Sequence, residues 1–410
     1  MNTHDRILWL DVMRVCACLM VMTVHATEPF YLGGEGSRIF TATDALWASF
    51  FDSFVRACVP LFVVTSSYLL FPLQTSAGAF FRRRAGRLLV PFVLWSLAYA
   101  LVWGDPVTNL RSLLLNFNYA AGHLWFVYML AGVYLLMPLL SPWAERVERR
   151  ELRGYLVLWG LTLLIPFVRE WASGGELLVV HGPTGIPNAA AYPLWGEASW
   201  NGYGTFYYVS GFVGYLLLGL YFRRFVPALS WRRTLCVALP LWLAGFALCF
   251  FGFLMRVWGS VSGFPFEGPV DVAVGWETPW YNDTLGVAFM TVGWLLLFRD
   301  KRLASPSSSA AAAATPSSPV PAPSKTSSAS AYLLTALSNA SYGMYLCHMF
   351  VLVWASAAFC GWLGTGTEGC LGMWTTPVEI ISTALTTFFV TALVCIPLQR
   401  IPLVGKWLVG

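Results

Sequence analysis

Long apolar stretches recur along the whole chain, and they constrain its fold more than any other feature. A helix needs about 20 mostly apolar residues to cross the core of a bilayer, and ten stretches approach or exceed that length. Charged residues make up only 11% of the 410 residues and apolar residues 57%, which leaves too little polar surface for a water-soluble domain. We therefore predict an all-α membrane protein with about ten transmembrane helices. The predicted spans cover residues 7–27, 45–71, 86–103, 124–143, 153–168, 203–222, 234–255, 284–298, 331–359 and 378–397.

Three of these spans are unusual. The stretches at 153–168 and 284–298 are short for a crossing helix. The stretch at 45–71 carries Asp52 and Arg56, and ionisable groups in lipid need a partner or a water-filled cavity. We expect this span either to be broken or to lean on neighbouring helices.

The distribution of positive charge orients the chain. Nineteen of the 25 Lys and Arg residues fall on one side when the loops are assigned alternately to the two sides. Because cytoplasmic loops carry the excess of Lys and Arg, both termini are predicted to lie in the cytoplasm. The protein is then a multi-pass protein of the cell (inner) membrane. Its net charge of +5 reflects topology and contact with anionic membrane lipid, not binding to nucleic acid.

One segment differs from the rest in composition. Residues 304–331 are rich in Pro, Ser and Ala and nearly devoid of charge and of bulky apolar side chains, so they cannot bury a core. We predict a disordered cytoplasmic linker. It divides one membrane domain into residues 1–303, with the first eight spans, and residues 332–410, with the last two.

The first span contains Asp11, Arg14 and His25. Arg14 and His25 are eleven residues, or three helical turns, apart, so they share one face of the helix about 16 Å apart along its axis. Charged groups inside a bilayer mark function by default. The alternative is an Asp11–Arg14 pair that holds the bundle together, with His25 at a wet helix end.

Four arginines, Arg82, Arg83, Arg84 and Arg87, lie at the entry to the third span. Arg84 and Arg87 are three residues apart and project together from a helix, and paired guanidinium groups bind phosphate well. The same cluster is also explained as an ordinary topology signal.

Three of the five histidines, His25, His123 and His348, are expected at similar depth near the outer surface. Imidazole is the natural general base at neutral pH, so three at one level raise the odds of a polar site there. Glu28 lies one turn beyond His25 and would either orient it or repel it, and the sequence does not decide which.

The predicted outer loops at 169–202 and 256–283 are rich in tryptophan and carboxylates. These rings either stack on a sugar or anchor the protein at the membrane interface. Cys360 and Cys370 share one outer loop, where an oxidising exterior would let them pair. No Cys/His spacing typical of a metal site is present, so we predict neither a metal nor a bound cofactor.

Taken together, these motifs resemble one protein family. The R-x10-H of Arg14 and His25, the R-x-x-R of Arg84 and Arg87, and the segments HLWFVYML and SYGMYLCH resemble the acyltransferase 3 type of integral-membrane acyltransferases. The resemblance runs from about residue 6 to 400. The context of His123 and Trp125 looks more like the branch that O-acetylates lipopolysaccharide and enterobacterial common antigen.

The resemblance implies transfer of an acyl group, usually acetyl, from cytoplasmic acetyl-CoA to a hydroxyl of an envelope glycan or lipid-linked sugar. It implies that His25 is the catalytic histidine, with Arg14 as its partner. Arg84 and Arg87, together with Arg83, are expected at the CoA-binding end. His348 and Tyr345 match the late segment, with Tyr345 a candidate for stabilising the oxyanion.

The residues leave two questions open. His25 either takes the proton of the acceptor hydroxyl directly or first carries the acyl group itself. The alternative class of protein is a secondary transporter or flippase for a carbohydrate or lipid-linked substrate, which would share the spans and the intramembrane charges. No clear repeat between residues 1–200 and 200–410 supports it. A membrane scaffold would leave Arg14 and Asp11 unexplained.

Overall fold

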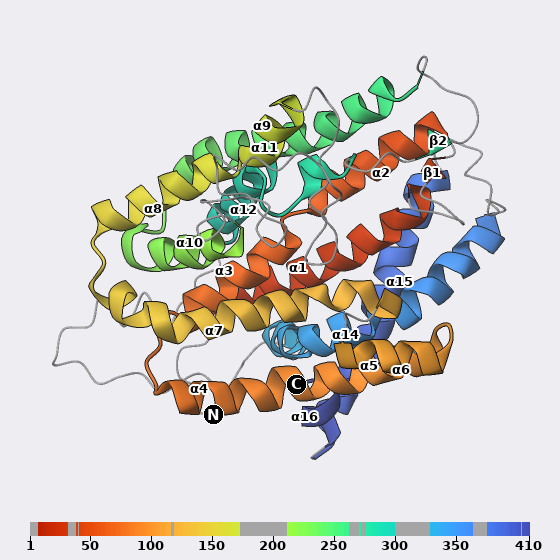
Figure 1. Cartoon of the computed structure of the whole chain (residues 1–410), viewed down its shortest axis with the longest axis horizontal. Coiled ribbons are helices and arrows are strands. Elements are labelled where there is room, and N and C mark those ends of the chain that lie inside the picture. The colour runs from red at the N-terminus through yellow and green to blue at the C-terminus, as the bar shows by residue number, and fades with distance from the viewer. Residues whose placement is uncertain are drawn as a thin grey trace.

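The structure of the protein, a computed structural model, is helical almost throughout (Figure 1). It describes residues 7–31, 38–39, 41–115, 119–172, 211–261, 270–271, 276–299, 329–363, 375–402 and 404–410. The all-α prediction is therefore confirmed for this part of the chain. The one exception is a minimal antiparallel ladder, in which Arg38 lies opposite Asp271 and Ile39 opposite Val270.

Helices make up nearly all of the described elements; η marks short 3-10 or π segments. The first half contains α1 (Leu8–Thr27), η1 (Glu28–Phe30), β1 (Arg38–Ile39), α2 (Ala42–Val55), α3 (Cys58–Leu70), α4 (Ala77–Arg84), η2 (Ala85–Leu89), α5 (Val90–Val102), α6 (Pro106–Leu115), η3 (Tyr119–Leu124), α7 (Trp125–Arg146), α8 (Arg149–Thr162) and α9 (Ile165–Ala172). The second half contains α10 (Phe212–Phe225), α11 (Trp231–Gly259), β2 (Val270–Asp271), η6 (Thr278–Trp280), α12 (Leu285–Phe298), α14 (Ala329–Leu363), α15 (Thr375–Leu398) and α16 (Val404–Leu408).

Eight helical stretches of the described chain are long and apolar enough to cross a membrane. They correspond to eight of the predicted spans. The other two, at 203–222 and 284–298, correspond to α10 and α12, which are 14 residues long each and fall short of the usual crossing length of about 20 residues. The count of ten and the cytoplasmic position of both termini stay predictions.

The span that contains Asp52 and Arg56 is broken, as expected. α2 ends at Val55 and α3 begins at Cys58, so Arg56 lies at the break. Its Nη2 is 2.6 Å from Asp52 Oδ2. Pro60 lies in the first turn of α3, where its missing N–H leaves no intrahelical hydrogen bond unmade. The chain can therefore restart a helix immediately after the break.

Helix α1 is the centre of the molecule. It runs through the middle of Figure 1 and contacts α2, α3, α12, α14 and α15. Its buried residues are distributed around the helix, as expected of a helix covered on most sides. The ionisable residues of α1 are therefore enclosed by protein.

Small residues bring α11 and α12 close together. A Cβ added at Gly245 would lie 2.4 Å from the carbonyl oxygen of Gly286, and one added at Gly286 would lie 2.8 Å from Cys249 Sγ. Membrane helices lack a hydrophobic drive to associate and depend on this kind of backbone approach. The two glycines therefore set the spacing of this helix pair.

Two predictions fall on residues outside the described chain. The linker at 304–331 lies there except for Ala329, Ser330 and Ala331, which begin α14. Cys370 also lies there, so its pairing with Cys360 stays a prediction.

Candidate active site

A cavity of about 1110 Å³ lies between α1, α3, α4 with η2, α7 and α14. Arg14, Val21 and His25 face it from α1, and their spacing of seven and four residues puts them on one side of the helix. The predicted face of α1 is therefore the face that lines the cavity. On α14 the cavity is lined by residues spaced three or four apart, which lie on one side of that helix: Ser338, Ser341, Tyr342 and Tyr345.

One part of the cavity wall is strongly basic. Arg14, Arg82, Arg83, Arg84 and Arg87 all line it, and among the described lining residues there is no Asp or Glu. Several guanidinium groups around one cavity attract anions and fit phosphate groups well. The arginines expected to bind CoA thus share a cavity with Arg14.

The local backbone supports this basic wall. α4 continues into a π-helical turn at Ala85–Leu89, and such turns are frequent at functional sites. The Arg84 guanidinium carbon lies 5.8 Å from the Phe80 ring and 5.7 Å from the Tyr134 ring. These cation–π contacts orient Arg84 on the wall.

The three histidines expected at one depth lie together. The ring centroids of His25 and His348 are 5.1 Å apart, those of His123 and His348 are 4.9 Å apart, and those of His25 and His123 are 6.1 Å apart. His25 and His123 line the cavity, whereas His348 does not and has no exposed surface. His348 packs against the other two rings.

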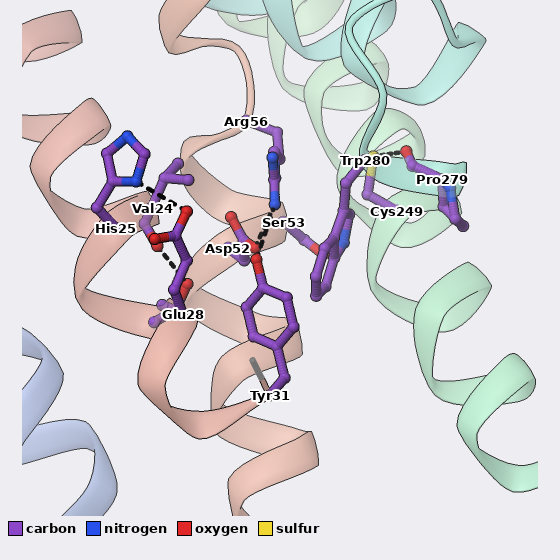
Figure 2. Close-up of polar contacts among 11 residues, drawn as sticks. Val24, His25, Glu28, Tyr31, Asp52, Ser53, Arg56, Cys249, Pro279 and Trp280 are labelled. Carbon is purple, nitrogen blue, oxygen red and sulfur yellow. Dashed lines mark hydrogen bonds and ion pairs between the residues drawn. The ribbon is translucent and has the colours of Figure 1, made fainter. Parts of the chain in front are cut away.

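Glu28 orients His25. Figure 2 shows His25 Nδ1 directed at the carboxylate of Glu28, and the distance from Nδ1 to Oε1 is 2.8 Å. A neutral imidazole that donates from Nδ1 keeps its lone pair on Nε2. The choice that the sequence left open is therefore settled in favour of orientation, and His25 has the arrangement of a base held by a carboxylate.

Tyr345 and His348 hold the main chain around the histidines. The Tyr345 hydroxyl donates to the carbonyl of His123, and His348 Nδ1 is 2.5 Å from the carbonyl oxygen of Tyr345. Tyr99 donates to the carbonyl of Leu346 at 2.9 Å. The Tyr345 hydroxyl proton is therefore used in the hydrogen bond to His123 and is not directed at a substrate in this arrangement. The catalytic roles expected of Tyr345 and His348 stay predictions.

A buried charged cluster lies beside the His25–Glu28 pair (Figure 2). Arg56 pairs with Asp52, approaches the Tyr31 hydroxyl at 3.4 Å, and lies 5.0 Å above the Trp280 ring. Trp280 donates to Ser53 Oγ at 2.9 Å. Burial, and next the charge of Asp52, raise the pKa of Tyr31 well above its usual value, so its phenol stays neutral. Two ionisable residues in an apolar stretch signalled this cluster, but nothing in the sequence pointed to Trp280.

The outer tryptophans divide into two groups. Trp276 and Trp280 are 3% and 0% exposed, so in this structure they are neither interfacial anchors nor an open platform for a sugar. Trp171 and Trp258 are 83% and 47% exposed and remain compatible with both roles. Trp195 and Trp200 lie outside the described residues.

These features define a class of protein. A multi-helix membrane protein with an arginine cluster and a carboxylate-oriented histidine on one cavity has the parts of a membrane-embedded group-transfer enzyme. The chain belongs to the acyltransferase 3 family: the family model described as "Acyltransferase domain" matches residues 7–396. It is thus a membrane acyltransferase. No curated protein and no solved structure matches it.

Proposed function

We propose that the protein moves an acyl group, acetyl in the first instance, from cytoplasmic acyl-CoA to a hydroxyl of an extracytoplasmic envelope glycan or lipid-linked sugar. One observation carries the proposal: a single cavity is lined both by the arginine cluster and by His25. An anionic donor docked on the arginines is then connected to the residue that reacts with its thioester.

The two ends of the donor match two parts of the wall. Its phosphates bind Arg83, Arg84 and Arg87, whose charges have no described carboxylate on the cavity wall to neutralise them. Its slender pantetheine arm follows the face of α1 from Arg14 to His25, a rise of about 16 Å for eleven residues. The thioester thus reaches His25 while the nucleotide stays at the basic wall.

The chemistry begins at His25 Nε2. Glu28 holds Nδ1 and stabilises the positive charge that the ring acquires when Nε2 takes a proton or an acyl group. The thiolate of CoA leaves toward the arginines, whose charge favours the anion.

The test is a sided assay with the purified protein in lipid vesicles. Labelled acetyl-CoA is supplied to one face only, and label is followed into an envelope glycan or lipid-linked sugar on the other. Transfer that requires the protein supports the proposal. If label never enters the acceptor, or if the acceptor crosses the membrane unmodified, the transporter alternative is favoured instead. Propionyl-CoA and longer acyl-CoAs compared in parallel define the acyl group.

Substituting Glu28 with glutamine is expected to lower kcat by about 10- to 10³-fold, because the amide orients His25 less well and cannot balance its positive charge. The KM for acyl-CoA is expected to change less than about twofold, since Glu28 does not line the basic wall. Steady-state kinetics of the purified variant measure both. Glu145→Gln, an exposed position of α7, is the matched control. A raised KM with an unchanged kcat would contradict the assigned role.

A further inference from the structure

His123 is the second histidine on the cavity wall. It lies in η3, directly before α7, and is 7% exposed. Its Nε2 is buried and has no hydrogen-bond partner among the described residues. An unpartnered polar atom in a protein interior is costly, and one on the wall of a substrate cavity is available to a ligand.

The position of His123 is set by α14. The Tyr345 hydroxyl donates a hydrogen bond to the His123 carbonyl oxygen, and the His123 ring packs against the rings of Tyr345 and His348, whose centroids are 6.0 and 4.9 Å away. When the neutral ring carries its proton on Nδ1, its lone pair is on Nε2. The rings of His123 and His25 meet edge to face, at an interplanar angle of 80°. Both side chains line the same cavity.

We propose that His123 is a second catalytic histidine, which takes the proton of the acceptor hydroxyl while His25 carries the acyl group. The proposal rests on the proposed function and divides its chemistry between the two rings. While His25 Nε2 is bonded to an acyl group it has no lone pair for a proton, and its Nδ1 is engaged by Glu28. A two-step transfer therefore needs another base, and His123 is the described histidine that shares the cavity with His25.

The two steps balance. In the first, His25 Nε2 forms a bond to the thioester carbon, the C–S bond breaks, and its electron pair leaves with sulfur. In the second, the acceptor oxygen bonds to the acyl carbon, and the hydroxyl proton moves to His123 Nε2. The C–N bond breaks and returns its electron pair to His25. His123 then gives its proton to the CoA thiolate, and both rings are neutral again.

Trapping the acyl group tests this division. Wild type, His25→Ala, His123→Ala and His123→Gln are each mixed with acetyl-CoA that carries the label in its acetyl group. The protein is denatured at neutral pH, freed of unbound acetyl-CoA and assayed for bound label, and transfer to acceptor is measured in parallel. We expect both His123 variants to hold at least as much label as wild type while transferring it about 100-fold more slowly. His25→Ala is expected to hold none. Size-exclusion profiles and thermal unfolding in detergent identify variants that fail to fold.

Rescue with free imidazole separates a base from a structural residue. His123→Ala opens a space on the cavity wall. Added imidazole is therefore expected to raise the transfer rate of this variant at least tenfold over its rate without imidazole. His348→Ala is the matched control: it removes a ring that does not line the cavity, and imidazole is expected not to restore it.

Three results would overturn the inference. The first is a transfer rate of folded His123→Ala within threefold of the wild-type rate. The second is a loss of transfer in His123→Ala that imidazole does not restore. The third is the absence of protein-bound label from wild type and all variants. If wild type still transfers acetyl groups, the proposed function stands in each case. If wild type transfers none, both fail.

Discussion

Replacing His25 with alanine is expected to lower the rate of acyl transfer by about 10²- to 10⁴-fold, the usual contribution of a positioned acid–base group. His25 is the cavity-lining residue that a carboxylate orients, through the 2.8 Å contact of Nδ1 with Glu28. The measurement is kcat with labelled acetyl-CoA at equal amounts of folded protein. Binding of acyl-CoA is expected to persist, because the arginines are untouched.

Glutamine at position 25 provides the companion variant. It retains the volume of the side chain and a hydrogen-bond donor for Glu28, but it cannot take up a proton or an acyl group. We expect His25→Gln to be as inactive as His25→Ala while unfolding at the wild-type temperature. If either variant transfers acetyl groups at more than a tenth of the wild-type rate, His25 does not perform the chemistry.

Removing the charges of Arg84 and Arg87 together is expected to raise the KM for acyl-CoA by about 10²- to 10⁴-fold. Hydrogen bonds to charged groups contribute about 1.5–3 kcal/mol each, and both side chains line the basic wall of the cavity. The double variant Arg84→Gln/Arg87→Gln is therefore expected to need more donor but to retain most of kcat. Titration of acyl-CoA at several salt concentrations measures the effect, which is expected to shrink as salt screens the wild-type charges.

Arg149 and Arg150 are the matched controls for that experiment. Both are exposed in α8 and neither lines the cavity, so the substitution of both by glutamine removes the same charge from the same protein. The KM of the Arg149→Gln/Arg150→Gln variant for acyl-CoA is expected to stay within about twofold of the wild-type KM. Equal effects of the two double variants would mean that the arginines act through overall charge and bind no particular group.

The features that depend on spacing along one helix were predictable from the sequence. Arg14 and His25 lie on one face because helical geometry requires it, and both line the cavity. Asp52 and Arg56 indicated that their span is either broken or leans on neighbouring helices, because charges inside an apolar stretch need a partner; the structure shows the break. The family was identified from the same motifs and is confirmed.

The features that depend on contacts between distant segments were not predictable. Trp280 lies on Arg56 although 224 positions separate them, and no pattern in either segment indicates the pairing. The depth of His123 was expected, but the contacts of its carbonyl and of its ring were not. Hydrogen bonds to main-chain oxygens leave no signal in the sequence, because every residue offers the same acceptor.

Helix α14 is joined to its neighbours in an asymmetric way. Tyr342 donates to the carbonyl of Leu88, and Tyr345 donates to that of His123; Tyr99 returns the contact by donating to Leu346 of α14. In each pair one residue contributes a specific hydroxyl and the other only its backbone. The two partners therefore tolerate substitution unequally. Leu88 and Leu346 can be exchanged for apolar residues of similar size, because any residue offers the same backbone carbonyl. Phenylalanine at position 99, 342 or 345 lacks the hydroxyl and so removes the hydrogen bond between the helices.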